Sequence, residues 1–299
     1  MISVVIPVFN EEKGIKHNIK TIIKNIPCEF EMIIIDDGSS DNTWIKIKEL
    51  SQEISSVRGI RFSKNFGKEN ALMAGINQSC GNAVITIDSD LQHPPKYIKK
   101  LIEKWNEGYK IVEIQKAERN KESFLYRICA KTFYGVLKKL SNLDMNNSSD
   151  YKLIDREVVD EIKKFKEVQL FFRGIVDWVG YNKCVLKVEF EDRKIGKSKF
   201  KFKSLLKLAI NAITSFSCSL LYITAFLGSA FFIATILIGI QAIVNKMIGN
   251  ELESYTIIIL FQLLIGSLIM FCLAIIGLYV GKIYEEVKHR PQYIISEKI

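Results

Sequence analysis

The sequence predicts a two-part molecule: an α/β domain with a mostly parallel sheet covered by helices on both faces, then a hairpin of two membrane-spanning helices. Short β-branched runs alternate with amphipathic helical patterns in the N-terminal part, which is typical of a parallel α/β sheet. Farther along the chain, no residue is charged from Leu208 to Val244 or from Ser254 to Gly281. Because a helix of about 20 apolar residues crosses a bilayer, each run is long enough to span it.

The N-terminal elements follow one another in a regular order. Strands are expected at Ile2–Val8, Phe30–Ile35, Gly59–Phe62 and Ala83–Ile87, and helices after Asn10–Glu12, from Thr43 to about Ile54, at Lys68–Gln78 and at Pro95–Trp105. Ligands of such sheets bind beyond the carboxyl ends of the strands. The polar clusters Pro7–Glu11, Asp36–Asp41 and Asp88–Gln92 fall there. No GxGxxG or GxxxxGK[ST] motif follows a strand, which excludes a dinucleotide-binding Rossmann domain and a P-loop protein.

The charge pattern predicts which side of the membrane holds the large domain. The 299 residues carry a formal charge of +9, and basic residues flank the hairpin on both outer sides, whereas the 245–253 turn carries one Lys and two Glu. The positive-inside rule therefore predicts a cytoplasmic domain, and the first residues contain no signal-peptide pattern. The basic stretch adjoins a span and no nucleic-acid motif is visible, so lipid headgroups or an anionic substrate are favoured over nucleic acid.

The cysteine pattern indicates the compartment, and the remaining segments give the expected domain boundaries. Six scattered cysteines without a CxxC pair favour a reducing compartment over a zinc knuckle or a disulfide framework. The expected parts are a cytoplasmic domain at 1–203, an amphipathic interfacial helix at 204–218, spans at about 220–244 and 256–280 within 219–282, and a cytoplasmic tail at 283–299. Ser123–Leu140 is a basic amphipathic helix that lies on a membrane surface or packs on the sheet. Glycines in the spans allow close packing, including in a homo-oligomer, or are ordinary membrane glycines.

Two clusters contain the residue types expected at a catalytic site. Asp88 and Asp90 bring like charges together after a buried strand, which is unfavourable unless a cation lies between them. Carboxylates together with a substrate phosphate suit Mg²⁺ or Mn²⁺, and Gln92 adds a neutral oxygen; the alternative is a solvated turn. The carboxylates and backbone N–H groups of Asp36–Ser39 suit the hydroxyls and ring nitrogens of a nucleoside, although capping of the next helix explains part of that cluster.

Nine segments, in order along the chain, match a known family: Val4–Glu11, Ile35–Asp41, Arg61–Ala74, Ile87–Pro95, Glu122–Arg127, Asp150–Leu153, Phe172–Gly174, Trp178–Gly180 and Arg193–Phe200. They resemble the family 2 glycosyltransferases with a GT-A fold. Within that family they resemble the polyprenyl-phosphate branch, which includes dolichyl-phosphate mannose synthase and bactoprenol glucosyltransferase. Two departures stand out: Lys116 replaces the first Arg of an R-x-x-R pair, and Ser149 ends a segment that usually reads N-x-G.

The resemblance implies a role for each matching position. The donor nucleotide would be bound by Pro7, Asn10, Glu11, Asp36, Asp37 and Asp88. A Mg²⁺ or Mn²⁺ cofactor would be held by Asp88, Asp90 and Gln92. Asp150 matches the aspartate proposed as catalytic, and the acceptor phosphate would be bound by Arg127, Arg193, Ser198 and Lys199. A lipid monophosphate is already largely anionic at neutral pH, so Asp150 is expected to orient the reactants or stabilise positive charge at the sugar instead of acting as a strong base.

The expected function is inverting transfer of one hexose from a nucleotide sugar to undecaprenyl phosphate in the bacterial inner membrane, by a multi-pass protein. The two-span tail resembles the bactoprenol members, which favours UDP-glucose over GDP-mannose. A processive polysaccharide synthase would carry a Q-x-x-R-W signature, which is absent. A non-catalytic membrane scaffold is the remaining alternative, and the presence of Asp88, Asp90, Gln92 and Asp150 argues against it.

Overall fold

The computed structural model describes residues 1–116, 149–165, 167, 171–188, 226–230, scattered positions between 233 and 248, and 254–299. The chain divides into two compact units. The first comprises Met1–Phe200 together with Arg290–Ile299, and the second comprises Lys201–His289. The C-terminal residues therefore belong to the α/β unit, although they follow the second unit in the sequence.

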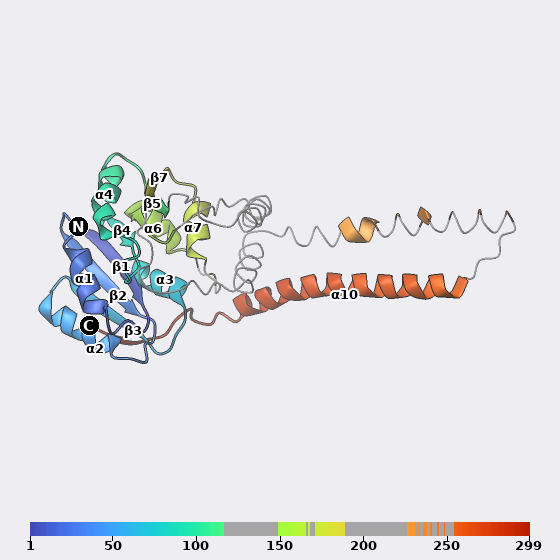
Figure 1. Ribbon diagram of the computed structural model, residues 1–299, viewed down its shortest axis with the longest axis horizontal. Helices are drawn as coiled ribbons and strands as arrows, with labels where there is room; N and C mark the ends of the chain where they lie inside the picture. Colours follow the sequence, from blue (N-terminus) through green and yellow to red (C-terminus); the bar gives the residue numbers. More distant parts are fainter. Residues whose placement is uncertain are drawn as a thin grey trace. The chain divides into compact units, whose positions relative to one another are not determined.

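Within the described residues, the first unit contains an eight-stranded sheet with the order β7-β5-β6-β4-β1-β2-β3-β8. Figure 1 labels β1 to β5 and β7 of this sheet. The strands are β1 (Ile2–Val8), β2 (Phe30–Asp36), β3 (Val57–Phe62), β4 (Ala83–Thr86), β5 (Ile111–Lys116), β6 (Lys152–Asp155), β7 (Lys183–Val188) and β8 (Ile295–Lys298). Strands β3, β2, β1 and β4 are parallel neighbours, as predicted. However, β6 runs antiparallel to both β4 and β5, and β8 runs antiparallel to β3, so the sheet as a whole is mixed.

Helices cover both faces of the sheet. They are α1 (Ile15–Ile23), α2 (Thr43–Glu53), α3 (Lys68–Gln78), the 3₁₀ turn η1 (Pro95–Tyr97), α4 (Ile98–Asn106), α6 (Arg156–Ile162) and α7 (Phe172–Trp178). Alternation along β2 separates the two cores: Ile34 packs with residues of α1, α2 and α4, whereas Ile35 packs with α3. Gly75 lets α3 lie close to β1, because a Cβ added there would be 2.2 Å from Val5 Cγ1.

The C-terminal segment, expected only as a tail, forms an edge strand. Gly59 and Ile299 exchange two backbone hydrogen bonds, and Tyr293 stacks on Phe62 with ring centroids 5.0 Å apart. The carboxylate of Glu297 accepts a 2.9 Å hydrogen bond from Trp44 Nε1. Strand β8 thus covers the backbone edge of β3, which would otherwise be open to other chains.

Among the described residues, one segment is long and apolar enough to cross a membrane. It is Leu264–Val287, within α10 (Ser254–Val287), and it continues past the expected end of the second span. The interfacial helix expected at 204–218, the helix at Ser123–Leu140 and most of the span at 220–244 lie outside the described residues. A Cβ added at Gly228, Gly266 or Gly277 would meet no heavy atom of the described residues within 4 Å.

Candidate active site

The loops after β1 and β2 are joined by hydrogen bonds between backbone and side chains. Asn10 has a positive φ of 55°, its backbone N–H donates to Ser39 Oγ at 2.9 Å, and its Oδ1 accepts from the Ser40 N–H at 2.9 Å. The Glu11 N–H donates to Thr43 Oγ1 at 2.9 Å. Polar residues at the start of α2 therefore hold the loop that follows β1, and the two loops form one wall of a cleft.

Asp36 and Asp37 use their carboxylates within the protein. Asp36 Oδ1 accepts from the Ser39 N–H at 2.9 Å. Asp36 Oδ2 is buried and accepts no hydrogen bond from the described residues, and it lies 3.4 Å from Arg61 Nε. Asp37 Oδ1 accepts from the Phe66 N–H at 2.7 Å, and Oδ2 accepts from the Gly67 N–H at 3.0 Å. Burial raises the pKa of both carboxyls. Asp37 therefore fixes the start of α3.

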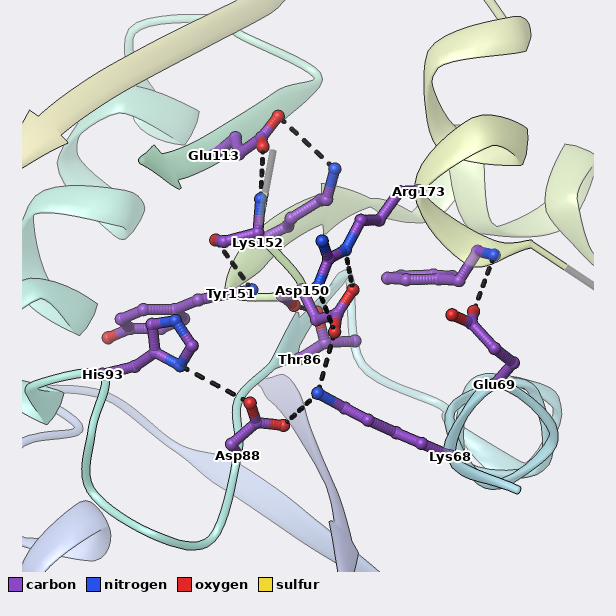
Figure 2. Close-up of polar contacts among 12 residues, drawn as sticks. Lys68, Glu69, Thr86, Asp88, His93, Glu113, Asp150, Tyr151, Lys152 and Arg173 are labelled. Atoms are coloured by element: carbon purple, nitrogen blue, oxygen red, sulfur yellow. Dashed lines mark hydrogen bonds and ion pairs between the residues drawn. The ribbon is translucent and has the colours of Figure 1, made fainter. Parts of the chain in front are cut away.

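Gly67 makes this contact possible. Its φ of 97° is one that other residues rarely adopt, and it directs the N–H toward Asp37 at the turn into α3. The next residue, Lys68, begins the helix and extends its side chain between two carboxylates (Figure 2). Lys68 Nζ lies 2.6 Å from Asp88 Oδ1 and 2.8 Å from Asp150 Oδ2. The first turn of α3 thus connects the loop after β2 to the loop after β4.

The loop after β4 presents the predicted metal ligands. Asp88 and Asp90 line a cleft of about 260 Å³ together with Pro7, Val8, Phe9, Glu11, Asp37, Lys68 and Ser89. Asp90 Oδ1 accepts from the Gln92 N–H at 3.0 Å, and Leu91 between them has a φ of 56°. Burial, followed by the nearby charge of Asp90, raises the pKa of Glu11, which lines the same cleft.

Asp150 is nearly buried beside this loop. Arg173 of α7 binds it with two hydrogen bonds, from Nε to Oδ1 at 2.6 Å and from Nη2 to Oδ2 at 2.9 Å. Burial alone would raise the pKa of Asp150, but Arg173 and Lys68 hold that pKa well below its usual range. Asp150 is therefore a permanent carboxylate at physiological pH and a poor proton acceptor.

The backbone on both sides of Asp150 is fixed by residues of two strands, β4 and β5. Thr86 Oγ1 of β4 donates to the Asp150 carbonyl oxygen, and the Ser149 N–H donates to Glu113 Oε1 of β5 at 2.9 Å. The Ser149 hydroxyl donates to the Ile114 carbonyl and accepts from the Tyr151 N–H at 3.2 Å. A glycine, usual at this position in the resembling family, would supply none of these hydroxyl contacts.

A buried ionic cluster lies behind these contacts. Glu113 and Lys152 are fully buried, and Glu113 Oε2 lies 3.4 Å from Lys152 Nζ and 2.6 Å from Lys183 Nζ. Burial opposes the charge on Glu113, but the two lysines keep the pKa of this carboxyl below its ordinary value. Since unpaired buried charges are very costly, the cluster strongly specifies how β5, β6 and β7 fit together.

Glu69, next to Lys68, holds the start of α7. Its Oε2 accepts from the Phe172 N–H at 2.7 Å (Figure 2). Burial, with the charge of Asp150 adding to it, raises the pKa of Glu69 to about 7. Two consecutive residues of α3 therefore position Asp150. Lys68 contacts it directly, and Glu69 holds the helix that carries Arg173.

The structure brings most of the predicted donor and metal residues together. Pro7, Glu11, Asp37, Asp88 and Asp90 line the cleft, whereas Asn10 and Asp36 organise its wall, and Gln92 contributes its backbone N–H to Asp90. The acceptor residues Arg127, Arg193, Ser198 and Lys199 lie outside the described residues. Sequence reasoning missed Lys68, Glu69 and Arg173. All three lie in segments that carried the family resemblance, which was the available signal.

The donor set fits a hard divalent cation only together with a substrate. Among the described residues, no group of three or more His, Cys, Asp and Glu is placed to hold a metal ion. Asp88 and Asp90 offer oxygen ligands at an open cleft, which suits an ion that takes its other ligands from phosphates and water. Such an ion would neutralise charge on a diphosphate leaving group.

The described residues have a GT-A-like α/β fold with a carboxylate-lined cleft, and the comparisons give the family. The family model for glycosyl transferase family 2 matches residues 3–163. The chain is 39% identical over 306 residues to the bactoprenol glucosyl transferase of Shigella phage SfV, with 99% of this chain and 98% of the relative covered. It is 37% identical to a prophage bactoprenol glucosyl transferase homolog of Escherichia coli K12 (99% and 98% covered) and 35% identical to an uncharacterized glycosyltransferase of Synechocystis (99% and 95%). The chain belongs to glycosyl transferase family 2.

A solved structure shares the fold. Glucosyl-3-phosphoglycerate synthase from Mycobacterium tuberculosis, crystallised with Mn²⁺, uridine diphosphate and phosphoglyceric acid, matches with a TM-score of 0.50. It is 22% identical, and the match covers 72% of this chain and 76% of that chain. The likeness supports the GT-A-like α/β architecture.

Proposed function

We propose that the protein transfers one glucose residue from UDP-glucose to undecaprenyl phosphate at the cytoplasmic face of a bacterial inner membrane, with inversion at the anomeric carbon. The observation that carries the proposal is its nearly full-length similarity to proteins named bactoprenol glucosyl transferase. The described cleft has the carboxylates that such a transfer needs. Because the similarity covers 99% of this chain, it includes the membrane segment as well as the α/β unit.

Different residues of the cleft are proposed to bind the donor and to act at the reaction centre. Pro7, Glu11 and Asp37 would receive the nucleoside, and Asp88 and Asp90, with Gln92, would hold Mg²⁺ or Mn²⁺ on the donor diphosphate. The phosphate of the acceptor is anionic without the help of a base, and Asp150 is itself held as a carboxylate by Arg173 and Lys68. Asp150 would therefore orient the reactants and stabilise positive charge at the sugar carbon. Arg127, Arg193, Ser198 and Lys199 are proposed to bind the acceptor phosphate.

The membrane segment is proposed to cross the bilayer twice. Both of its ends lead into the same α/β unit, because Arg290–Ile299 belong to that unit together with Met1–Phe200. A segment that starts and ends on one side must cross an even number of times. Leu264–Val287 supplies one candidate span, and the uncharged run that ends at Val244 would supply the other. Basic flanks favour the cytoplasmic side.

The proposal is tested by transfer of labelled sugar into an organic-extractable lipid. Membranes containing the protein receive undecaprenyl phosphate and, separately, UDP-glucose, UDP-galactose, UDP-N-acetylglucosamine or GDP-mannose, with Mg²⁺ or Mn²⁺ and with EDTA. Labelling from UDP-glucose, lost with EDTA and in Asp90→Asn, is expected. Labelling from GDP-mannose would replace the proposed donor by the mannose alternative. No labelling from any donor by folded protein would contradict a transferase function on this lipid.

A further inference from the structure

The Lys68 ammonium occupies the position between two carboxylates that have different expected tasks. It lies 2.6 Å from Oδ1 of Asp88, an expected metal ligand, and 2.8 Å from Oδ2 of Asp150 (Figure 2). The three residues come from the start of α3, the loop after β4 and the turn into β6. The Lys68 ammonium therefore bridges two like-charged carboxylates beside the cleft.

The two carboxylates depend on this ammonium unequally. Asp150 is bound on both oxygens by Arg173, so it keeps a cationic partner when Lys68 moves away. Asp88 has Lys68 on Oδ1, and its Oδ2 lies 3.6 Å from His93 Nδ1. The contact between Lys68 and Asp88 is therefore the one that can be exchanged for another cation without leaving Asp150 unpaired.

A divalent cation on Asp88 and the ammonium on the same carboxylate would repel each other strongly at such short range. We propose that Lys68 occupies Asp88 until the divalent cation binds, and that its ammonium then turns to the phosphates of the donor. The proposal rests on the proposed function, because it takes a nucleotide diphosphate as the donor. In this scheme Lys68 is both a competitor of the metal and a ligand of the donor.

The surroundings of Lys68 permit this exchange. Its side chain is 41% exposed and lines the same cleft as Asp90 and Phe9. A lysine side chain has a flexible four-carbon stem and three rotatable donors, which suits movement between a carboxylate and a phosphate oxygen. Asp37 holds the N–H groups of Phe66 and Gly67, so the backbone of the helix start stays in place while the side chain moves.

The test measures Mn²⁺ binding to the full chain in detergent by the electron paramagnetic resonance signal of free Mn²⁺, without sugar donor or lipid. Lys68→Gln is expected to bind Mn²⁺ about threefold more tightly or better, because the competing cation is gone. In the presence of Mn²⁺, the same variant is expected to bind UDP about threefold more weakly. Lys104→Gln is the matched control. Within the described residues the ion-pair partner of Lys104 is the exposed Glu107, so this variant should leave both affinities unchanged.

Other variants keep the proposal open to refutation. Lys68→Arg retains the charge and should bind Mn²⁺ no more tightly than the native protein. When Lys68→Gln is combined with Asp88→Asn, it should no longer tighten Mn²⁺ binding. Unchanged or weaker Mn²⁺ binding by Lys68→Gln overturns the proposal, as does an equal gain in Lys68→Arg. Unchanged UDP binding by Lys68→Gln overturns the second step. Because no glucose or lipid is used, failure here is distinguishable from failure of the proposed glucosyl transfer.

Discussion

The first turn of α3 meets two carboxylate sites that are stabilised in different ways. Asp37 accepts hydrogen bonds from backbone N–H groups of Phe66 and Gly67, whereas Asp150 is held by the side-chain cations of Lys68 and Arg173. Backbone donors cannot leave without deforming the chain, so the Asp37 side of the cleft has a fixed shape. Side-chain cations can exchange partners, so the Asp150 side can respond to a metal ion or a phosphate.

The largest effect is expected when the carboxylate of Asp150, which side-chain cations hold, loses its charge. Asp150→Asn leaves Lys68 and Arg173 without their shared carboxylate and removes the negative charge from the proposed reaction centre. We expect glucosyl transfer to fall by about a hundredfold or more, and the free energy of unfolding to fall by about 3 kcal/mol. Transfer rates and thermal unfolding in one detergent measure the two effects. Asp160→Asn on α6, which removes an exposed carboxylate, is the control. Native rates in Asp150→Asn would contradict the assigned role.

The next effect concerns Glu69, whose pKa is raised to about 7. An acid with a raised pKa keeps a proton in the folded state that the unfolded chain has already released. The contribution of Glu69 to the free energy of unfolding is therefore most favourable below pH 4.5. It is lost as the pH rises to about 7, a change of roughly 3 kcal/mol.

Glu69→Gln preserves the acceptor for the Phe172 N–H but removes the titration. The variant should gain stability over the native protein at pH 8 and much less at pH 5, measured as the difference between their melting temperatures at each pH. An equal difference at both values would show that Glu69 does not titrate in this window. Glu157→Gln, which removes an exposed carboxylate, provides the comparison.

The smallest effect is expected in the stability difference between variants of Asp37 and Asp88. In Asp37→Asn, the amide presents an N–H₂ group to one of the backbone donors, and we expect a loss of about 1 to 2 kcal/mol. Asp88→Asn lies in the exchangeable site and is expected to lose less stability but most of its Mn²⁺ binding. Chemical unfolding of both variants measures the contrast. Greater destabilisation in Asp88→Asn would reverse the comparison.

The N-terminal half of the sheet was predictable because its information is local. Apolar runs and helical periodicity located β1–β4 and the intervening helices, and α3 was predicted with both of its ends. Strand β8 was not predicted, because Ile295–Lys298 is short and half-exposed and its pairing with β3 joins residues more than two hundred positions apart. The two-span hairpin remains a prediction, with one candidate span described.

The sequence by itself determined which chemical groups lie at the carboxyl edge of the sheet, because strand ends and polar clusters follow from local pattern. It identified Asp88, Asp90 and Asp150 as the residues of interest but contained no spacing rule that relates them. Only the tertiary structure decided that Lys68 lies between Asp88 and Asp150 and that Arg173 binds Asp150 on both oxygens. The physical reason is that ion pairs depend on distance in space, and only the packing of α3 and α7 near β4 and β6 brings these charges within reach.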